Sequence, residues 1–319
     1  MLKVAIVGCG GISRSHLNSW KQIPEAKIVG ACDVRAEKYQ VFVDETGCNG
    51  YLDFSTMLRR EKPDIVDICL PTYLHADYAV KALKHGCHVL TEKPISLKMR
   101  DVDRVYNAAR RANRRVMVAQ VLRFWREYMA LADAYHTGRY GRLLSGTMLR
   151  LGNMPKWSWD NWMRDPERSG LVPFDLHIHD LDFIIATFGS PKNVVCDRAR
   201  NERQDYIHAI YHFDDFFIAT EAAWFDCKYK FQSGFRFQFE KAVLEFKDGE
   251  LTIFHDDDTE EKLADEPTGE ENGINLPKTN AYYNEIRYFT DCVLAEKDCD
   301  WVKPEELKEV LRLIRKLEK

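Results

Sequence analysis

The first 120 residues alternate between short, continuous apolar runs and longer stretches in which apolar residues recur with helical spacing. A run that is apolar at nearly every position is typical of a parallel strand buried on both faces. We therefore expect strands at 4–7, 27–32, 65–70, 87–90 and 116–119, with helices between them. Repeated alternation of strand and helix with short loops predicts an α/β fold with a doubly wound parallel sheet.

From residue 143 the pattern changes to longer strand-like segments without intervening helices. These segments are 143–151, 194–200, 206–213, 216–224, 234–240, 242–247 and 251–255. Sequential strands joined by short turns predict a large, mostly antiparallel sheet in an α+β domain. We expect closing helices at 282–295 and 304–317, and an acidic loop at 256–273. A length of 319 residues suits two domains. We place them at 1–121 and 122–319, and the closing helices, about 281–319, can pack back on the first domain.

A glycine-rich turn, Gly8-Cys9-Gly10-Gly11-Ile12-Ser13, follows the first strand and matches G-x-G-x-x-G with serine in the third glycine place. Gly8 permits the tight turn, and Gly10 lets the backbone approach a pyrophosphate. A helix that starts at Gly11 and Ile12 would offer its free N–H groups to that anion. The turn therefore predicts a Rossmann dinucleotide site in the first domain.

Asp33 ends the second apolar run, where an acidic residue contacts the adenosine ribose 2′-hydroxyl in such sites. A carboxylate there repels a 2′-phosphate, which favours NAD(H). Arg35, two residues later, could instead grip the phosphate of NADP(H). Asp33 could also cap the following helix, and the two roles can coexist.

Further candidate residues follow the ends of the later strands, where parallel sheets bind ligands. They are Leu70, Pro71, Thr72 and His75 after the third strand, Glu92 and Lys93 after the fourth, and Gln120 after the fifth. Pro94 restricts the backbone of Lys93 and would hold this lysine at the sheet edge. The plainer alternatives are a surface lysine at a strand end and a histidine satisfied within the first turn of its helix.

Two segments of the second half carry candidate substrate chemistry. Trp157, Trp159 and Trp162 lie within six residues among polar side chains, which suits the wall of a sugar or cyclitol pocket better than a core. Arg123 is a further candidate substrate contact. In the second segment, Phe174-Asp175-Leu176-His177-Ile178-His179-Asp180-Leu181-Asp182, the length favours a helix, on which Asp175 and His179 share a face. His177 and His179 would point apart, so we expect no metal site.

Charge and cysteine content narrow the classes of function. A net charge of −4 gives no electrostatic argument for nucleic acid as a partner. The nine cysteines include no C-x-x-C pair, which argues against a disulfide framework and a zinc site and favours a reducing cytoplasm. The start MLKVAIVGCG does not read as a signal peptide, and no apolar run is long enough to span a membrane.

Taken in order, VGCGGISRSH, TEKP and FDLHIHDLD resemble the glucose–fructose oxidoreductase/inositol dehydrogenase (Gfo/Idh/MocA) family over nearly the whole chain. The resemblance implies NAD(P)-dependent alcohol/ketone interconversion on a sugar, inositol or related polyol. It also implies catalytic positions at Lys93, Asp175 and His179, and a homodimer or homotetramer built through an open-faced sheet. Two departures lie near the expected substrate: His177 stands where the family often has glycine, and 168–171 replaces a more glycine-rich approach.

We therefore hypothesise an NAD(H)-linked sugar or polyol dehydrogenase in which His179 exchanges the hydroxyl proton. A non-catalytic dinucleotide sensor would not need Lys93, Asp175 and His179. A reductase of another small carbonyl or imine is the third possibility. The aromatic residues of the second-half sheet, among them Phe217, Trp224, Phe235, Phe237 and Phe239, would form an apolar outer interface, or alternatively pack on the closing helices.

Overall fold

A computed structural model describes residues 1–264 and 279–317 of the chain. Of the loop predicted at 256–273, residues 265–273 lie outside the described residues, and 260–262 form a short strand. The chain folds into two units. Among the described residues, the first unit comprises Met1–Val121 and Ala281–Lys308, and the second comprises 122–264, 279–280 and 309–317.

The first unit is built on a six-stranded parallel sheet with the order β3-β2-β1-β4-β5-β6. Its strands are β1 (Leu2–Val7), β2 (Ala26–Cys32), β3 (Asn49–Tyr51), β4 (Ile65–Ile68), β5 (His88–Glu92) and β6 (Val116–Ala119). Its helices are α1 (Ile12–Lys21), α2 (Ala36–Thr46), α3 (Phe54–Glu61), α4 (His75–Lys84), α5 (Met99–Ala112) and α9 (Ala281–Leu294), with a 3₁₀ turn η1 (Thr72–Leu74). Helix α9 packs on α1 within this unit.

Local signals explain where these helices begin and end. The Asp53 carboxylate caps α3 by accepting a hydrogen bond from the Thr56 N–H at 2.6 Å. Gly47 ends α2 in the left-handed region, where the absence of a Cβ removes the steric penalty. Asn113 ends α5 in the same conformation. The short strand β3 was not predicted, because three residues show too little periodicity.

The second unit contains an eight-stranded sheet with the order β14-β13-β12-β11-β7-β10-β9-β8. Its strands are β7 (Leu143–Asn153), β8 (Asn193–Arg200), β9 (Asp205–His212), β10 (Phe217–Phe225), β11 (Gln232–Phe239), β12 (Ala242–Lys247), β13 (Glu250–His255) and β14 (Glu260–Lys262). Neighbouring strands are antiparallel except for β7 and β10. The predicted fold class, a Rossmann sheet followed by a mostly antiparallel sheet, is confirmed.

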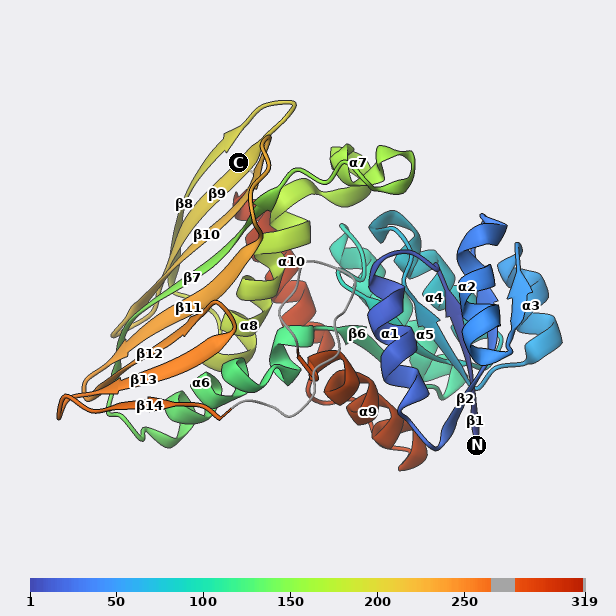
Figure 1. The fold of residues 1–319 in the computed structure, drawn as a ribbon, viewed down its shortest axis with the longest axis horizontal. Helices are drawn as coiled ribbons and strands as arrows, with labels where there is room; N and C mark the ends of the chain where they lie inside the picture. The colour runs from blue at the N-terminus through green and yellow to red at the C-terminus, as the bar shows by residue number, and fades with distance from the viewer. Residues whose placement is uncertain (265–278, 318–319) are drawn as a thin grey trace. The chain divides into compact units, whose positions relative to one another are not determined.

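Helices cover one face of the eight-stranded sheet (Figure 1). They include α6 (Arg126–Thr137) and α8 (Ile178–Phe188). Along the chain, α6 follows the 3₁₀ turn η2 (Val121–Phe124). Three short elements come before α8: the 3₁₀ segment η3 (Trp159–Arg164), the four-residue helix α7 (Pro166–Ser169) and the π-helical turn η4 (Pro173–His177). The remaining helix, α10 (Pro304–Leu317), has residues in both units. The closing helices predicted at 282–295 and 304–317 are confirmed by α9 and α10.

The aromatic side chains of this sheet lie mainly on its helical face. Phe235 of β11 contacts Tyr128 of α6 at a ring distance of 5.0 Å, and Phe237 stacks on Phe188 of α8 at 5.6 Å. Trp224 is also buried, whereas Phe217 is 44% exposed on the opposite face. The expectation that these residues make the outer face apolar is therefore wrong for most of them. Of these residues, Phe235 packs on α6 and Phe237 on α8.

Candidate active site

The glycine turn after β1 has one tightly packed glycine, Gly8, and one glycine with open space beside it, Gly10. Gly8 has φ +88°, and a Cβ there would lie 2.5 Å from the carbonyl oxygen of Cys69, so neither the conformation nor the space admits a side chain. At Gly10 a Cβ would meet no described atom within 4 Å, so internal packing does not demand glycine. The space beside Gly10 suits a ligand that approaches the backbone.

Helix α1 begins directly after this turn. Its N-cap is Gly11, and among the described residues no side chain caps it and no acidic residue lies in its first turn. The N–H groups and the positive end of the helix dipole are therefore available to an anion. Open space at Gly10 and a helix terminus without a side-chain cap together fit the pyrophosphate of a dinucleotide.

Asp33, at the end of β2, is joined to the glycine turn. Its Oδ2 accepts a hydrogen bond from the Cys9 N–H at 2.9 Å, and its Oδ1 accepts one from the Arg35 N–H at 3.0 Å. The Arg35 Nε lies 3.5 Å from the same Oδ1. Arg35, not Asp33, is the N-cap residue of α2, so the capping role considered for Asp33 is wrong. The carboxylate is placed beside the turn where a ribose would bind.

The loop after β4 is held by His75, which is 1% exposed. Its Nδ1 lies 2.6 Å from the Pro94 carbonyl oxygen and its Nε2 lies 2.6 Å from the Leu70 carbonyl oxygen. Burial lowers the pKa of His75, while the two carbonyl contacts oppose that shift. Each ring nitrogen faces a backbone carbonyl oxygen, which favours a structural role in joining this loop to the segment after β5. Pro71 is half-buried, and Thr72 and Gln120 are buried at the same sheet edge.

Glu92 and Lys93 end β5 in different environments. Glu92 is 8% exposed, and its Oε2 accepts a hydrogen bond from the backbone N–H of Lys93 at 2.9 Å. The Lys93 side chain is half-buried, and the Lys93–Pro94 peptide is cis. Lys93 belongs to the first unit, whereas Asp175 and His179 belong to the second.

In the second unit, Asp175 lies in the π-helical turn η4 and His179 in the first turn of α8. The helix predicted for this segment is confirmed, but it begins with a π turn, a feature often found at functional sites. Asp175, Leu176 and His179 are half-buried, whereas His177 and Asp180 are enclosed. Asp175 and His179 therefore share the partly exposed side of the helix, as their spacing indicates.

His177 points away from that side. Its Nε2 lies 2.6 Å from the Tyr211 hydroxyl on β9. Burial, followed by the nearby Arg150 cation, lowers the pKa of His177 to about 3, so the imidazole is neutral. A neutral, enclosed imidazole is a packing element of the sheet–helix interface and does not converge with His179.

Two buried ion pairs anchor this helix. Arg150 of β7 lies 2.9 Å from Asp180, and Arg123 of η2 makes two hydrogen bonds to Asp182, of 2.8 and 2.7 Å. Arg123 is 9% exposed, so this bidentate pair favours an anchoring role over the predicted substrate contact. Sequence reasoning did not find the Arg150–Asp180 pair, although a buried-strand arginine and a helical aspartate were the available signals.

The tryptophan segment presents aromatic surface. Trp157 is 68% exposed and Trp159 41% exposed, while Trp162 is half-buried. The segment is tied back on itself by an ion pair of 3.0 Å between Arg168 and Asp160. Exposed indole faces beside polar groups can stack on the apolar face of a sugar ring.

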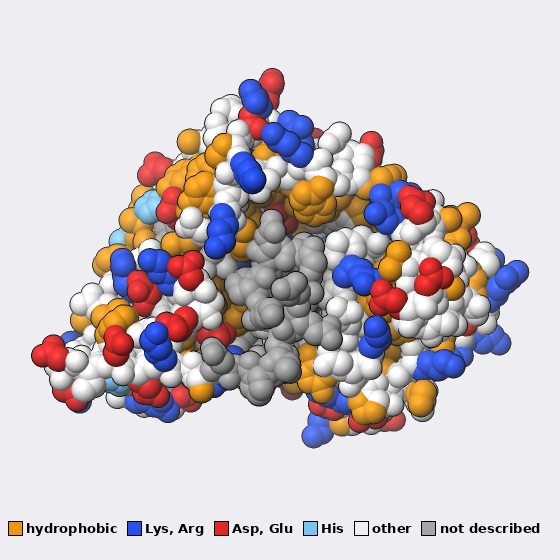
Figure 2. All heavy atoms as spheres, viewed as in Figure 1, with side chains coloured by type: hydrophobic (Ala, Val, Ile, Leu, Met, Phe, Trp, Pro, Cys, Tyr) orange, Lys and Arg blue, Asp and Glu red, His pale blue; other side chains and the backbone are white. Residues whose placement is uncertain are grey.

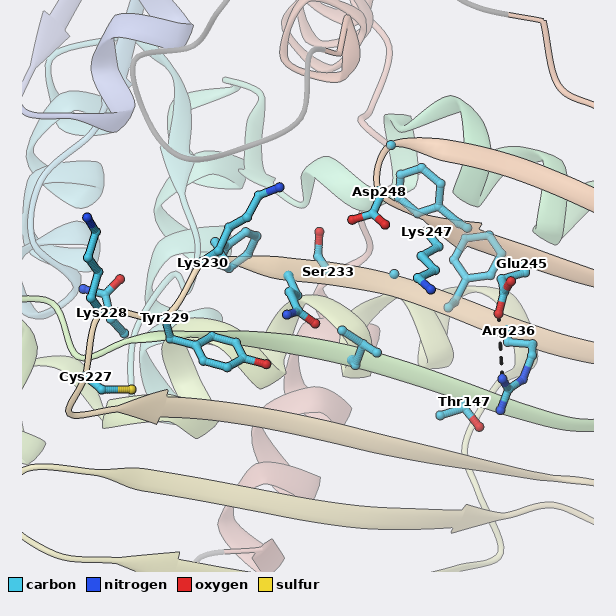
Figure 3. A pocket seen from close by; sticks show the side chains of 18 of the residues that line it. Thr147, Cys227, Lys228, Tyr229, Lys230, Ser233, Arg236, Glu245, Lys247 and Asp248 are labelled. Carbon is cyan, nitrogen blue, oxygen red and sulfur yellow. Dashed lines mark ion pairs between the residues drawn. The ribbon is translucent and has the colours of Figure 1, made fainter.

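A groove of about 1230 Å³ lies on the outer face of the eight-stranded sheet, opposite the helices (Figure 3). Side chains of Thr147, Arg236 and Glu245 form its floor, and Arg236 and Glu245 are 3.7 Å apart. None of the predicted site residues lines this groove.

In the view of Figure 2, positive and negative side chains are interspersed on the described surface of each unit. Over residues 1–264 and 279–317, no helix has the length and apolar character needed to cross a membrane.

The sequence matches two family descriptions. Residues 2–120 match an oxidoreductase family with an NAD-binding Rossmann fold, and residues 128–245 match the GFO/IDH/MocA C-terminal domain. The D-apiose dehydrogenase of Paraburkholderia graminis is 29% identical over 199 residues, which cover 62% of this chain and 52% of that protein. The 2,7-anhydro-N-acetylneuraminate hydratase of Mediterraneibacter gnavus is 29% identical over 180 residues, covering 56% of this chain and 47% of that protein.

The chain thus spans about half the length of the curated relatives it matches, with 52% and 47% of those two proteins covered. The solved structure of the UDP-N-acetylglucosamine 3-dehydrogenase of Acidithiobacillus ferrooxidans superposes with a TM-score of 0.79 at 20% identity, covering 99% of this chain and 96% of that one. That likeness concerns the fold. The two family matches confirm the resemblance and the predicted NAD-binding domain. The chain belongs to the Gfo/Idh/MocA family of oxidoreductases, and its first unit is an NAD-binding Rossmann domain.

Proposed function

We propose that this protein is an NAD(H)-linked dehydrogenase that acts on a hydroxyl group of a sugar, inositol or related polyol. The observation that carries this proposal is the pair Asp175 and His179, which share the partly exposed side of the helix at a π turn. A protein that only senses a dinucleotide would not need an acid–base pair on a second unit. The two curated relatives are named for reactions of sugars, which supports this substrate class.

Oxidation of a carbinol removes a proton from its hydroxyl group and a hydride from its carbon. Nicotinamide, when bound, supplies the hydride acceptor. His179 takes the hydroxyl proton, because imidazole exchanges protons readily at neutral pH, and returns it in the reverse direction. Asp175 hydrogen-bonds the hydroxyl or orients the imidazole. Lys93, provided by the NAD-binding domain, stabilises the developing negative charge on oxygen.

The remaining residues bind and orient. The glycine turn and the amino end of α1 would hold the pyrophosphate, and Asp33 the adenosine ribose. The carboxylate of Asp33 favours NAD(H), although the adjacent Arg35 guanidinium offers a contact for the phosphate of NADP(H). Trp157 and Trp159, which are exposed, form a stacking wall for the sugar.

A redox-neutral reaction on the same substrate class is the second candidate, because one relative is named a hydratase. The test must therefore follow products as well as nicotinamide absorbance. The purified protein is incubated with NAD⁺ or NADP⁺ and a panel of sugars, anhydrosugars, inositols and small carbonyl or imine compounds. Oxidation raises absorbance at the reduced nicotinamide band, whereas a hydration or elimination changes the sugar without net reduction. Neither change across the panel, despite tight NAD binding, would favour the sensor.

The assigned roles are tested with Lys93→Ala and His179→Ala. General acid–base groups contribute about 10²–10⁴-fold, so each variant should lose about that much kcat while NAD affinity changes little. Lys98→Ala, on an exposed lysine of the same segment, and His208→Ala, on the outer sheet face, are the matched controls. Near wild-type turnover of His179→Ala would remove the proposed base. Loss of NAD binding in Lys93→Ala would make the lysine a cofactor anchor.

We also propose that two copies associate through the outer face of the eight-stranded sheet. The side chains of Val195, Phe217 and Phe254 are 50%, 44% and 40% exposed on that face, and they lie on three different strands.

The nine cysteines are all free thiols, which supports a reducing compartment such as the cytoplasm.

A further inference from the structure

A buried chain of charged side chains runs from helix α1 to the end of β5. His16, on α1, is 0% exposed. Its Nδ1 lies 2.9 Å from Oδ2 of Asp67 on β4, and its Nε2 lies 3.1 Å from Oε1 of Glu92 on β5. The indole N–H of Trp20, one turn further along α1, donates to the same Asp67 oxygen at 2.7 Å. Three elements of the first unit are therefore joined around one imidazole.

The geometry determines the charge of that imidazole. Ionised carboxylates only accept hydrogen bonds, so an imidazole held between two of them must donate from both nitrogens, which makes it a cation. Burial is the largest single effect and lowers the pKa of His16, but the charge of Asp67, the neighbouring Cys69 and the hydrogen bonds to both together raise that pKa well above its usual range. Burial raises the pKa of Glu92, but the hydrogen bond to His16 together with the charges of His16 and Lys93 gives a net lowering of that pKa. A buried cation between two buried anions follows.

The far end of this chain is the backbone of Lys93. The second oxygen of Glu92 accepts the Lys93 N–H at 2.9 Å, and His75 contacts the carbonyl oxygen of the next residue, Pro94, at 2.6 Å. The backbone is therefore contacted by buried polar side chains at the Lys93 N–H and at the Pro94 carbonyl. The same helix that carries His16 begins at the glycine turn.

We propose that His16 is a positioning residue that fixes Lys93 through Glu92. The network links helix α1, which begins at the pyrophosphate site, to Lys93 at the sheet edge. The position of Lys93 relative to α1 is thereby held fixed. This inference rests on the proposed role of Lys93 in the chemistry.

A metal centre is the competing explanation, because ligand atoms of His16, Asp67 and Cys69 lie within 4.8 Å of one another. Both nitrogens of His16 already face carboxylates, which leaves no lone pair for a metal. Burial, followed by the Asp67 charge, raises the pKa of the Cys69 thiol to about 12, so it keeps its proton at neutral pH. The protonated thiol lies 3.7 Å from Asp67 Oδ1 as a donor.

The first test uses the unmodified protein and needs no substrate. In ¹⁵N spectra of histidine-labelled protein, His16 should show two protonated ring nitrogens up to pH 8. A neutral imidazole at pH 7 would overturn the proposal, and so would one equivalent of zinc retained after dialysis.

The second test reports on Lys93 directly. Lysines are converted to ¹³C-dimethyl-lysine, and the Lys93 signal is identified by its loss in Lys93→Arg. In His16→Gln this signal should shift and broaden. In Ser19→Ala, which removes a buried hydroxyl from the same helix outside this network, it should not change. An unchanged Lys93 signal in folded His16→Gln would contradict the proposal. Glu92→Gln, which retains an oxygen for the Lys93 N–H, provides the same readout if His16→Gln does not fold.

The third test separates positioning from stability once a substrate is known. His16→Gln should lower kcat on the order of 10- to 100-fold with KM for NAD nearly unchanged, because displacement of a catalytic group by about 1 Å costs up to about 10²-fold. A change in KM alone would count against positioning. Because the two spectroscopic tests need no turnover, they remain decisive even if the proposed dehydrogenase activity is not found.

Discussion

Single residues in the two units show how burial and neighbouring charge set a histidine's state. His16 lies between two carboxylates and is a cation, whereas His177 meets a tyrosine hydroxyl beside Arg150 and is neutral. The residue type is the same and both side chains are enclosed, so the partners decide the charge. The two histidines consequently change the stability of the fold in opposite directions with pH.

His177 should make the protein less stable in acid. Its pKa is about 3 in the folded state, below the ordinary unfolded value, so protons bind preferentially to the unfolded chain. The contribution of neutral His177 to the free energy of unfolding is fully present above about pH 6.5. Below that pH the free energy of unfolding falls by about 1.4 kcal/mol per pH unit, towards pH 3. Urea unfolding of His177→Gln at pH 7 and pH 5 should show a smaller pH effect than wild type. His208→Gln is the control, and equal pH effects in all three proteins would contradict this.

His16 should act in the other direction. Its pKa is raised by folding, so its contribution is complete below about pH 6.5 and is lost as pH rises towards its folded pKa. The wild type should therefore lose stability between pH 7 and pH 9, and Asp67→Asn should reduce that loss because the main source of the raised pKa is removed. Chemical unfolding at the two pH values measures the difference. An Asp67→Asn variant with the full wild-type loss would show that His16 is not the cause.

Cofactor choice depends on Asp33. The carboxylate should disfavour NADP(H) by about 1–3 kcal/mol, because like charges lie close in a partly buried site. Wild type should bind NAD(H) more tightly, and Asp33→Ser should reverse or remove the preference by leaving Arg35 to meet the phosphate. Direct binding titrations of both reduced cofactors provide the measurement. Tighter NADP(H) binding by wild type would show that Arg35 outweighs Asp33.

At the scale of elements, the turn between β1 and α1 contains two glycines with different roles: Gly8 is required by the fold, whereas Gly10 faces the space proposed for the ligand. Gly8→Ala should destabilise the protein, because φ +88° costs about 1–3 kcal/mol without glycine and a Cβ would clash with Cys69. Gly10→Ala should keep wild-type stability but weaken NAD binding about tenfold or more, equivalent to about 1.4 kcal/mol. Thermal unfolding and cofactor titration of both variants test the contrast. Undiminished NAD binding by Gly10→Ala would remove this loop as the pyrophosphate site.

The π turn has a comparable role in the second unit. It lies where the chain enters α8, and it carries Asp175 on the partly exposed side while His177 packs on Tyr211. The His177 imidazole fills space between helix and sheet, so it does not occupy the side that bears Asp175 and His179.

For the molecule as a whole, the outer face of the eight-stranded sheet should govern assembly. Light scattering at micromolar concentration should give at least twice the 37.2 kDa mass of one chain. Phe217→Glu, which places a charge on that face, should dissociate the assembly, whereas Phe237→Ala on the helical face should not. Instead, Phe237→Ala should lower the free energy of unfolding by about 3–5 kcal/mol, because it empties a buried site. A single-chain mass for wild type would contradict the proposed interface.

Much of the fold was predictable because its signals are local. Buried parallel strands and strand-length segments each have a characteristic hydrophobic period, and the glycine turn has a steric requirement that Gly8 satisfies. The helix that carries Asp175 and His179 followed from length and a terminal glycine, Gly189. For the same reason the family motifs could be recognised in order along the chain.

Pairings between distant residues were decided only by the tertiary structure. His16 meets Asp67 and Glu92 across 51 and 76 residues of sequence, a pairing that neither the acid inside the apolar strand β4 nor the one at the end of β5 indicated by itself. The parallel pairing of β7 with β10, and the side of the sheet on which Phe235 and Phe237 lie, depend on strand order and register. Alternation along one strand shows that two faces differ, but only the packing partners determine which face the helices cover.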